Sequence, residues 1–98
     1  MIRATLIPSP LKRHKWRMIF TRKPDFEEAV DFGAKGYYDY TQHHDDKRKQ
    51  LFLSRFKKLI DRYKDDPSAP MTLSHQLLWT EKDLGVALKN YKKKYNLL

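Results

Sequence analysis

The stretch from Phe32 to Asp46 separates a part of the chain with strand-like patterning from a part with helical patterning. It holds two of the chain's three glycines, three tyrosines and the only adjacent histidines, and it ends in two aspartates. Apolar residues recur at every second position before this stretch and at helical spacing after it. The sequence therefore predicts a sheet joined here to a group of helices, with Gly33 and Gly36 supplying a positive φ or a close backbone approach.

Two segments before this joint have the alternation of an antiparallel β-hairpin. Lys15–Thr21 and Phe26–Gly33 each place apolar side chains at every second residue, as strands with one buried face do. The residues between them include two bases, a proline and an aspartate and suit a turn, so the loop is expected near Lys23–Asp25.

The position of this loop sets the register of the two strands. It places Arg17 opposite Asp31 and Trp16 opposite Phe32, an ion pair and an aromatic pair that both favour strand pairing. An isolated two-stranded hairpin is only marginally stable in water. The face that carries Trp16, Phe20 and Phe32 is therefore expected to pack on helices.

Residues 1–14 are predicted to form an extended basic arm outside the folded domain. Pro8 and Pro10 end any strand begun upstream and favour an extended chain beyond it. The alternation of residues 2–7 is also compatible with one strand, and chain termini are often disordered. An arm that becomes ordered against a neighbouring molecule is the third interpretation of the same residues.

After the joint, the pattern predicts a helix from Asp45 to about Lys64, with Asp45 and Asp46 suited to its N-terminus. One side of this helix carries an apolar stripe expected to face the core, formed by Phe52, Phe56, Leu59, Ile60 and Tyr63. The opposite arc is basic around one exposed apolar residue, Leu51. Its cations are Lys47, Arg48, Arg55, Lys58 and Arg62.

Two shorter helices are predicted beyond a loop that contains Pro67 and Pro70. Thr72 or Ser74 is expected to cap the first of them, which runs to about Trp79. The segment from Thr80 approximates a capping box for the last helix, with aspartate in place of the usual glutamate. Lysines gather at the C-terminal end of that helix, where the helix dipole favours them.

These patterns predict the α+β fold class: an N-terminal antiparallel β-hairpin packed on about three helices, with an extended N-terminal arm. The 98 residues are enough for one domain, which gives an arm over residues 1–14 and a single small domain over residues 15–98. The chain has no cysteine, so disulfides and thiolate metal sites are excluded. No apolar run approaches the roughly 20 residues of a membrane-spanning helix, and the start lacks the apolar core of a secretion signal.

The candidates for catalytic or metal chemistry are His43, His44, Asp45 and Asp46, with Asp39 nearby. Adjacent histidines point in different directions, and no metal-binding spacing of histidines occurs. We therefore expect a helix-capping cluster with solvent-facing histidines, because these residue types are preferred at a helix N-terminus. No serine or lysine stands in a recognisable nucleophilic arrangement. The sequence predicts no enzyme activity, no catalytic residue, no metal, no cofactor and no small-molecule substrate.

The formal net charge is +9, and the basic and acidic residues lie in separate blocks along the chain. A basic excess predicts an acidic partner, either a protein surface or a nucleic acid. The residues expected to bind it lie in the arm and on the basic arc: Arg3, Lys12, Arg13, Lys47, Arg48, Leu51, Arg55, Lys58 and Arg62. Leu51 suits a protein contact, whereas Tyr37, Tyr38 and Tyr40 are available to stack on bases.

An FGAKGY-DYT-H-D string, a basic helix with an arginine, an S..LLW segment and a tyrosine near the end together resemble a family of small basic proteins of large DNA viruses, including algal viruses. The matching residues are Phe32, Gly33, Ala34, Lys35, Gly36, Tyr37, Asp39, Tyr40, Thr41, His43, Asp45, Arg55, Ser74, Leu77, Leu78, Trp79 and Tyr91. The chain departs from the pattern at Phe56, where the family suggests histidine, and at His75, where it suggests arginine.

The resemblance implies a viral origin, and abundant small basic proteins of such viruses are often virion components. The expected function is a minor capsid or other structural protein of the virion, binding between larger capsid proteins. A nucleic-acid-binding protein of genome packaging or replication is the alternative. The expected location is the virion, and the host cytoplasm or nucleus during assembly.

Overall fold

The computed structural model describes residues 2–22 and 25–98 and has a three-stranded antiparallel sheet followed by helices. The strands, in the spatial order β1-β2-β3, are β1 (Arg3–Pro8), β2 (His14–Arg22) and β3 (Phe26–Ala34). The helices are α1 (Tyr40–His43), α2 (Asp46–Tyr63), α3 (Pro70–Leu78) and α4 (Leu84–Lys94). This arrangement confirms the predicted α+β class.

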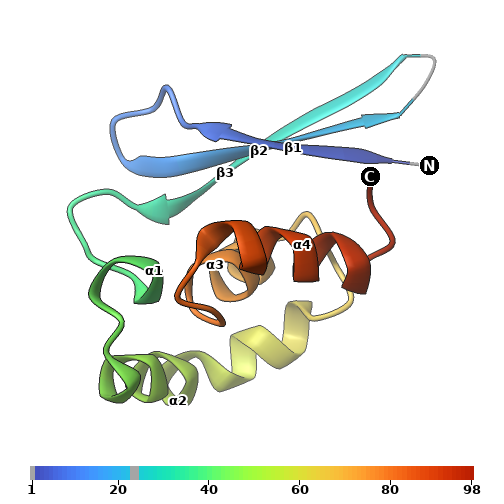
Figure 1. Ribbon diagram of the computed structural model, residues 1–98. Coiled ribbons are helices and arrows are strands. Elements are labelled where there is room, and N and C mark those ends of the chain that lie inside the picture. The colour runs from blue at the N-terminus through green and yellow to red at the C-terminus, as the bar shows by residue number, and fades with distance from the viewer. Residues whose placement is uncertain (1, 23–24) are drawn as a thin grey trace.

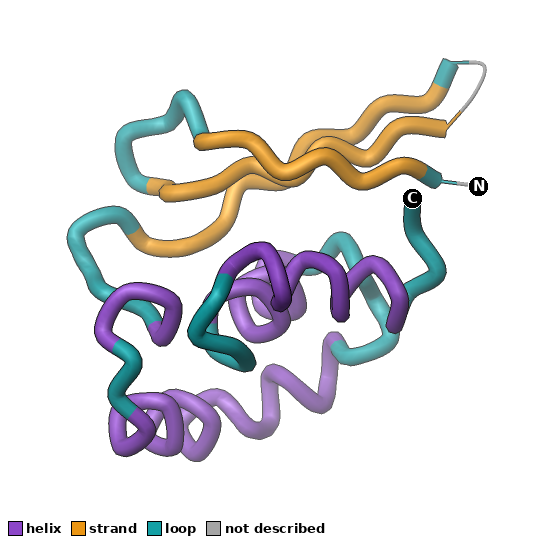
Figure 2. The backbone as a smooth tube through the Cα atoms, in the orientation of Figure 1, coloured by secondary structure: helices purple, strands orange, loops and turns teal. Residues whose placement is uncertain are grey.

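In the described chain the helices all lie on one side of the sheet, and none of them covers its other face (Figures 1 and 2). Helices α3 and α4 lie next to the sheet, and α2 forms an outer layer beyond them (Figure 1). The molecule therefore consists of three layers, with the sheet on one outer side and α2 on the other.

The β2–β3 hairpin has the predicted register, with Trp16 opposite Phe32 and Arg17 opposite Asp31. The Arg17 Nε atom lies 3.0 Å from Asp31 Oδ1, and the Ser9 hydroxyl donates to the same oxygen at 2.7 Å. These hydrogen bonds, first from Arg17 and then from Ser9, hold the pKa of Asp31 below its usual value. Of the turn predicted near Lys23–Asp25, residues 23 and 24 lie outside the described residues.

The extended arm predicted for residues 1–14 is instead a strand over Arg3–Pro8, paired with β2 along its whole length. Ala4 lies opposite Phe20, and its side chain is 1% exposed. The far side of this strand is partly closed by the other end of the chain, because the Ala4 amide donates to the Leu98 carbonyl at 2.8 Å. The prediction of an arm was wrong because the apolar side of this segment packs against the helices, and its burial stabilises the ordered strand.

The core lies between the sheet and the two inner helices. Its largest fully buried side chains are Met18 and Phe32 from the sheet, Leu73, Leu77 and Leu78 from α3, and Tyr91 from α4. The Tyr91 hydroxyl donates to the Pro67 carbonyl at 2.6 Å, which satisfies its polar atom inside the core. The prediction that the apolar face of the hairpin packs on helices is therefore confirmed.

The apolar stripe of α2 was predicted to be buried, and this was wrong: none of the residues of α2 is buried. Leu59 and Tyr63 remain 38% and 37% exposed. Because α3 and α4 lie between α2 and the sheet, only a narrow side of α2 finds a partner. On that side, the Phe52 ring stacks on Trp79 with centroids 4.2 Å apart and planes inclined by 3°.

The predicted caps of the last two helices were also wrong. Helix α3 begins at Pro70, a residue that suits the first position of a helix because it lacks an N–H and has a fixed φ. The Thr72 hydroxyl instead donates to the Tyr63 carbonyl at 2.6 Å, which ties α3 to the end of α2. Helix α4 is capped by Asp83, whose carboxylate accepts from the Gly85 amide at 2.7 Å, and not by Thr80.

Both glycines of the joint have a positive φ, +78° at Gly33 and +94° at Gly36, as the sequence predicted. A methyl group at Gly33 would meet the Leu78 side chain at 2.9 Å, whereas a methyl group at Gly36 would meet no described atom within 4 Å. Gly33→Ala and Gly36→Ala are each expected to lose about 1–2 kcal/mol of unfolding free energy from backbone strain, with a larger loss for Gly33→Ala. Urea denaturation of the two variants measures this difference, and equal losses would contradict a close contact between Gly33 and α3.

Candidate functional site

A cleft of about 510 Å³ lies between the loop that follows β3, helix α2 and helix α3. Its lining is mainly apolar and comes from every layer of the molecule. The lining residues are Lys15, Gly33, Ala34, Tyr37, Tyr38, Asp39, Arg48, Leu51, Phe52, Arg55, Phe56, Met71, Ser74, Leu78 and Trp79. Clefts of roughly 300–1,000 Å³ with a few polar groups in an apolar lining are typical of binding sites.

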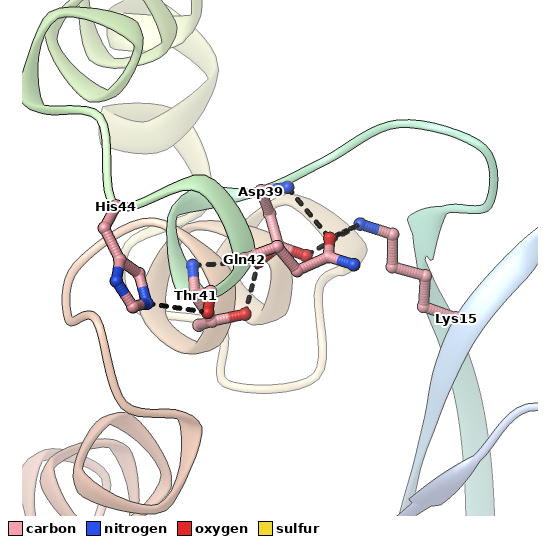
Figure 3. Close-up of polar contacts among 5 residues, drawn as sticks. All are labelled: Lys15, Asp39, Thr41, Gln42 and His44. Carbon is pink, nitrogen blue, oxygen red and sulfur yellow. Dashed lines mark hydrogen bonds and ion pairs between the residues drawn. The ribbon is translucent and has the colours of Figure 1, made fainter.

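The loop at the rim of the cleft is fixed by a short helix that the sequence analysis did not predict. Asp39 caps α1: its side chain accepts from the Thr41 amide at 3.0 Å, and the Gln42 side chain accepts from the Asp39 amide at 3.0 Å. Lys15 of β2 reaches Asp39 Oδ2 and Gln42 Oε1, both at 2.7 Å (Figure 3). An aspartate followed three residues later by glutamine is a capping-box signal from which this turn could have been predicted.

The capped loop presents two neighbouring tyrosines to solvent. Tyr37 and Tyr38 are 75% and 71% exposed, whereas the next two residues, Asp39 and Tyr40, are 3% and 5% exposed. The change occurs within one step of the chain because Asp39 is held by Lys15 and by the cap. In the tyrosine-rich segment, Asp39 and Tyr40 are therefore buried parts of the fold, whereas the exposed rings of Tyr37 and Tyr38 border the cleft.

The wall opposite this loop is formed by one side of α2. Leu51 projects from it and is 62% exposed. The Arg55 guanidinium lies 5.2 Å from the centre of the Phe56 ring. Arg48 Nε lies 3.8 Å from Asp45 Oδ2, and because both side chains are about half exposed, this pair stabilises the fold little. The two arginines thus bring positive charge to an apolar opening.

The histidine and aspartate cluster beside the cleft has a structural role. Asp45 caps α2 by accepting from the Lys47 amide at 2.9 Å and the Arg48 amide at 3.3 Å, as predicted. His44 is exposed, also as predicted. The prediction that both histidines face solvent was wrong for His43, which packs against Trp79 with ring centroids 5.4 Å apart. The Tyr40 ring also lies near His43, with ring centroids 6.2 Å apart, so His43 has two aromatic neighbours and is half-buried.

His43 and Asp46 also help to attach α2 to α1. The Asp45 amide donates to His43 Nδ1 at 2.9 Å, and the Tyr40 hydroxyl donates to Asp46 Oδ1. The hydrogen bond from Tyr40 lowers the pKa of Asp46 and raises the pKa of Tyr40 itself. Within residues 2–22 and 25–98, no three histidine or carboxylate side chains lie close enough together to hold a metal ion.

The structure exposes most of the residues predicted to bind a partner and places six of them along α2. The predicted residues of α2, namely Lys47, Arg48, Leu51, Arg55, Lys58 and Arg62, are all exposed. Lys12 and Arg13 are exposed in the β1–β2 turn, and the Arg13 carbonyl accepts from the Lys35 amide at 3.0 Å, beside the loop of the cleft. Arg3 is separate, because it lies at the other end of β1 (Figure 1).

Sequence reasoning missed the cleft itself. It assigned Phe52 and Phe56 to the core and left Trp79 at a helix end, whereas the structure places all three in the lining of the cleft.

None of the described helices is long and apolar enough to cross a membrane.

Residues 4–56 match the model of a family of unknown function, DUF5754. The matched segment is more than half of the 98-residue chain and includes the sheet, α1 and the first part of α2. The chain belongs to this family. In this member of DUF5754, the matched segment supplies the sheet, loop and α2 walls of the cleft, and the remaining wall, from α3 and Trp79, lies outside it. No curated protein and no solved structure matches the chain.

Proposed function

We propose that the protein is a non-enzymatic structural component of a virus particle, a minor capsid or other virion protein that binds a larger capsid protein through α2. The observation that carries the proposal is that α2 has no buried residue yet keeps an apolar residue, Leu51, among exposed cations. A helix that contributes so little to the core, and that displays charge around an apolar centre, suits a protein interface. The viral origin is supported by the sequence resemblance described above.

The binding surface under this proposal differs from the one expected of a free arm. Because residues 3–8 are part of the sheet, the N-terminal segment does not supply a flexible strand for a neighbour. Lys12 and Arg13 remain exposed in a turn next to the loop of the cleft, so they add positive charge beside that loop. The proposed contact is therefore made by a preformed surface, which loses little conformational entropy on binding.

The non-enzymatic part of the proposal is supported by the roles of the titratable groups near the cleft. Asp39 and Asp45 serve as helix caps, His43 packs between aromatic rings, and Lys15 is paired with Asp39. Each of these groups takes part in a helix cap, a packing contact or an ion pair, and these contacts support a structural role for them.

Binding of single-stranded nucleic acid in genome packaging or replication is the second candidate. The specific observation in its favour is that Tyr37 and Tyr38 expose their rings beside Arg48 and Arg55. Aromatic rings next to arginines bind unpaired bases by stacking and phosphates by charge. This candidate predicts an affinity that falls steeply with salt concentration.

Quantitative mass spectrometry of purified particles of the virus that encodes the chain tests the first candidate. The protein is expected at a fixed ratio to the major capsid protein, and it should remain with the shell after nuclease removes the genome. Its absence from particles, or its loss together with the genome, would contradict the proposal.

Charge reversal tests whether α2 makes the contact. Lys58→Glu combined with Arg62→Glu changes exposed residues of α2 that do not line the cleft. Lys89→Glu combined with Lys93→Glu is the matched control, with the same change of charge on exposed positions of α4. Incorporation into particles is expected to fall at least about tenfold for the α2 variant only, as is usual when charge complementarity becomes repulsion. Equal incorporation of both variants would exclude Lys58 and Arg62 from the docking face.

A further inference from the structure

We propose that the cleft binds an acidic peptide segment of a partner protein, which inserts one large apolar side chain beside Leu51, Phe56 and Met71 while its flanking carboxylates meet Arg48 and Arg55. The inference deepens the proposed function and rests on it, because it names the part of the partner that α2 recognises. It also states the chemistry of that segment, an apolar anchor with acidic neighbours.

The cleft has the room and the lining for one anchoring side chain. Its volume of about 510 Å³ suits a large apolar group together with part of the peptide backbone. Leu51, which is 62% exposed, is stabilised by being covered, since burial of apolar surface is the main driving force of association. Met71 adds an unbranched side chain that adapts to irregular shapes, and Ser74 adds one hydroxyl to the lining.

The charge around the opening is complementary to carboxylates. Arg48 and Arg55 are seven residues apart on α2, so they lie about 10 Å apart along the helix axis and flank Leu51 and Phe52. Arginine binds carboxylates with paired hydrogen bonds. The one acidic residue of the lining, Asp39, is 3% exposed and already pairs with Lys15 Nζ at 2.7 Å, so it offers little repulsion.

The packing of the aromatic rings favours a peptide over a nucleic acid at this position. One face of Trp79 is covered by Phe52, with centroids 4.2 Å apart, and one face of Phe56 is covered by Arg55 at 5.2 Å. Bases need open ring faces on which to stack. These contacts reduce the ring surface on which a base could stack inside the cleft, so an inserted side chain that contacts ring edges and methyl groups fits better. Tyr37 and Tyr38 then close over the anchor from the rim, as tyrosines do at protein interfaces.

The test is an NMR titration of the ¹⁵N-labelled full chain with a synthetic peptide, acetyl-Asp-Glu-Phe-Glu-Asp-amide. Saturable shifts are expected at Leu51, Arg55 and Met71, and the neighbouring amides. Replacing the phenylalanine by serine, or the four acids by lysine, should weaken binding at least about tenfold, because each change removes one of the two recognised features. Absence of saturable shifts at the cleft up to millimolar peptide would overturn the inference.

Protein variants place the binding in the cleft. Leu51→Glu is expected to abolish the shifts, whereas Leu59→Glu, the same change on the same helix outside the cleft lining, should leave them intact. Both positions are exposed, and the amide spectrum of each variant verifies that it is folded. Equal binding by the two variants would overturn the inference, as would displacement of the peptide from the cleft by single-stranded oligothymidine.

The outcomes separate this inference from the proposed function. A protein that enters particles through α2 but does not bind the peptide retains the proposed function without the cleft mechanism. A protein that binds the peptide in the cleft but is absent from particles has a peptide site with a different biological partner.

Discussion

Replacing Phe32 with alanine is expected to lower the free energy of unfolding by about 3–5 kcal/mol. Phe32 is 1% exposed and lies in the centre of the core, where β3 faces α3. Its removal loses the burial of a large ring and leaves a cavity that the surrounding side chains fill only partly. For a domain of this size such a loss is a large fraction of the total stability. Guanidinium denaturation followed by circular dichroism measures it.

Phe26→Ala is the matched control, because Phe26 is the same residue type in the same strand but is 48% exposed. Its loss of unfolding free energy is expected to be below about 1 kcal/mol, as for most exposed positions. If the two variants lost equal stability, the helices would not pack on the part of the sheet that contains Phe32.

Replacing Asp39 with alanine is expected to lower the free energy of unfolding by about 2–4 kcal/mol, since one substitution removes two kinds of contact. The first is the cap of α1, through the bond to the Thr41 amide. The second is the ion pair with Lys15, whose side chain is 14% exposed and would be left with Gln42 as its hydrogen-bond partner. Thermal and urea denaturation give the size of the loss.

Asp45→Ala provides the comparison, because Asp45 caps α2 in the same way but its side chain is 47% exposed. Loss of a solvent-exposed cap is expected to cost about 1 kcal/mol. A greater loss for Asp45→Ala than for Asp39→Ala would mean that the Lys15 contact adds nothing and that the rim of the cleft is not held by it.

The sheet shows what local patterns determine. The pairing of Arg17 with Asp31 and of Trp16 with Phe32 was predictable, because an antiparallel hairpin aligns neighbouring segments through one turn. Strand β1 was not predicted with the same clarity. Its apolar alternation is short and ends at Pro8, and only the distant partners of Ala4, from β2 and the C-terminal residue, make the ordered strand preferable to an arm.

Helix α2 shows what such patterns do not determine. The apolar spacing of Phe52 and Phe56 correctly indicates which side of the helix faces the protein. It does not indicate how far from the core the helix lies, because that distance is set by the helices that come between them. The cleft results from this distance, so its lining could not be predicted, although the cap at Asp39 that fixes its rim could have been.

The outer position of α2 has a consequence for how binding and order are linked. Because α2 buries no residue, releasing it from α3 exposes little apolar surface, and its local opening requires less free energy than unfolding of the sheet. A partner that binds only the attached helix would shift this local equilibrium toward closure. The affinity of the protein for its partner is then governed in part by how firmly Phe52 and Trp79 hold the helix in place, so that substitutions beneath α2 change recognition through the attachment of the helix as well as through the lining of the cleft.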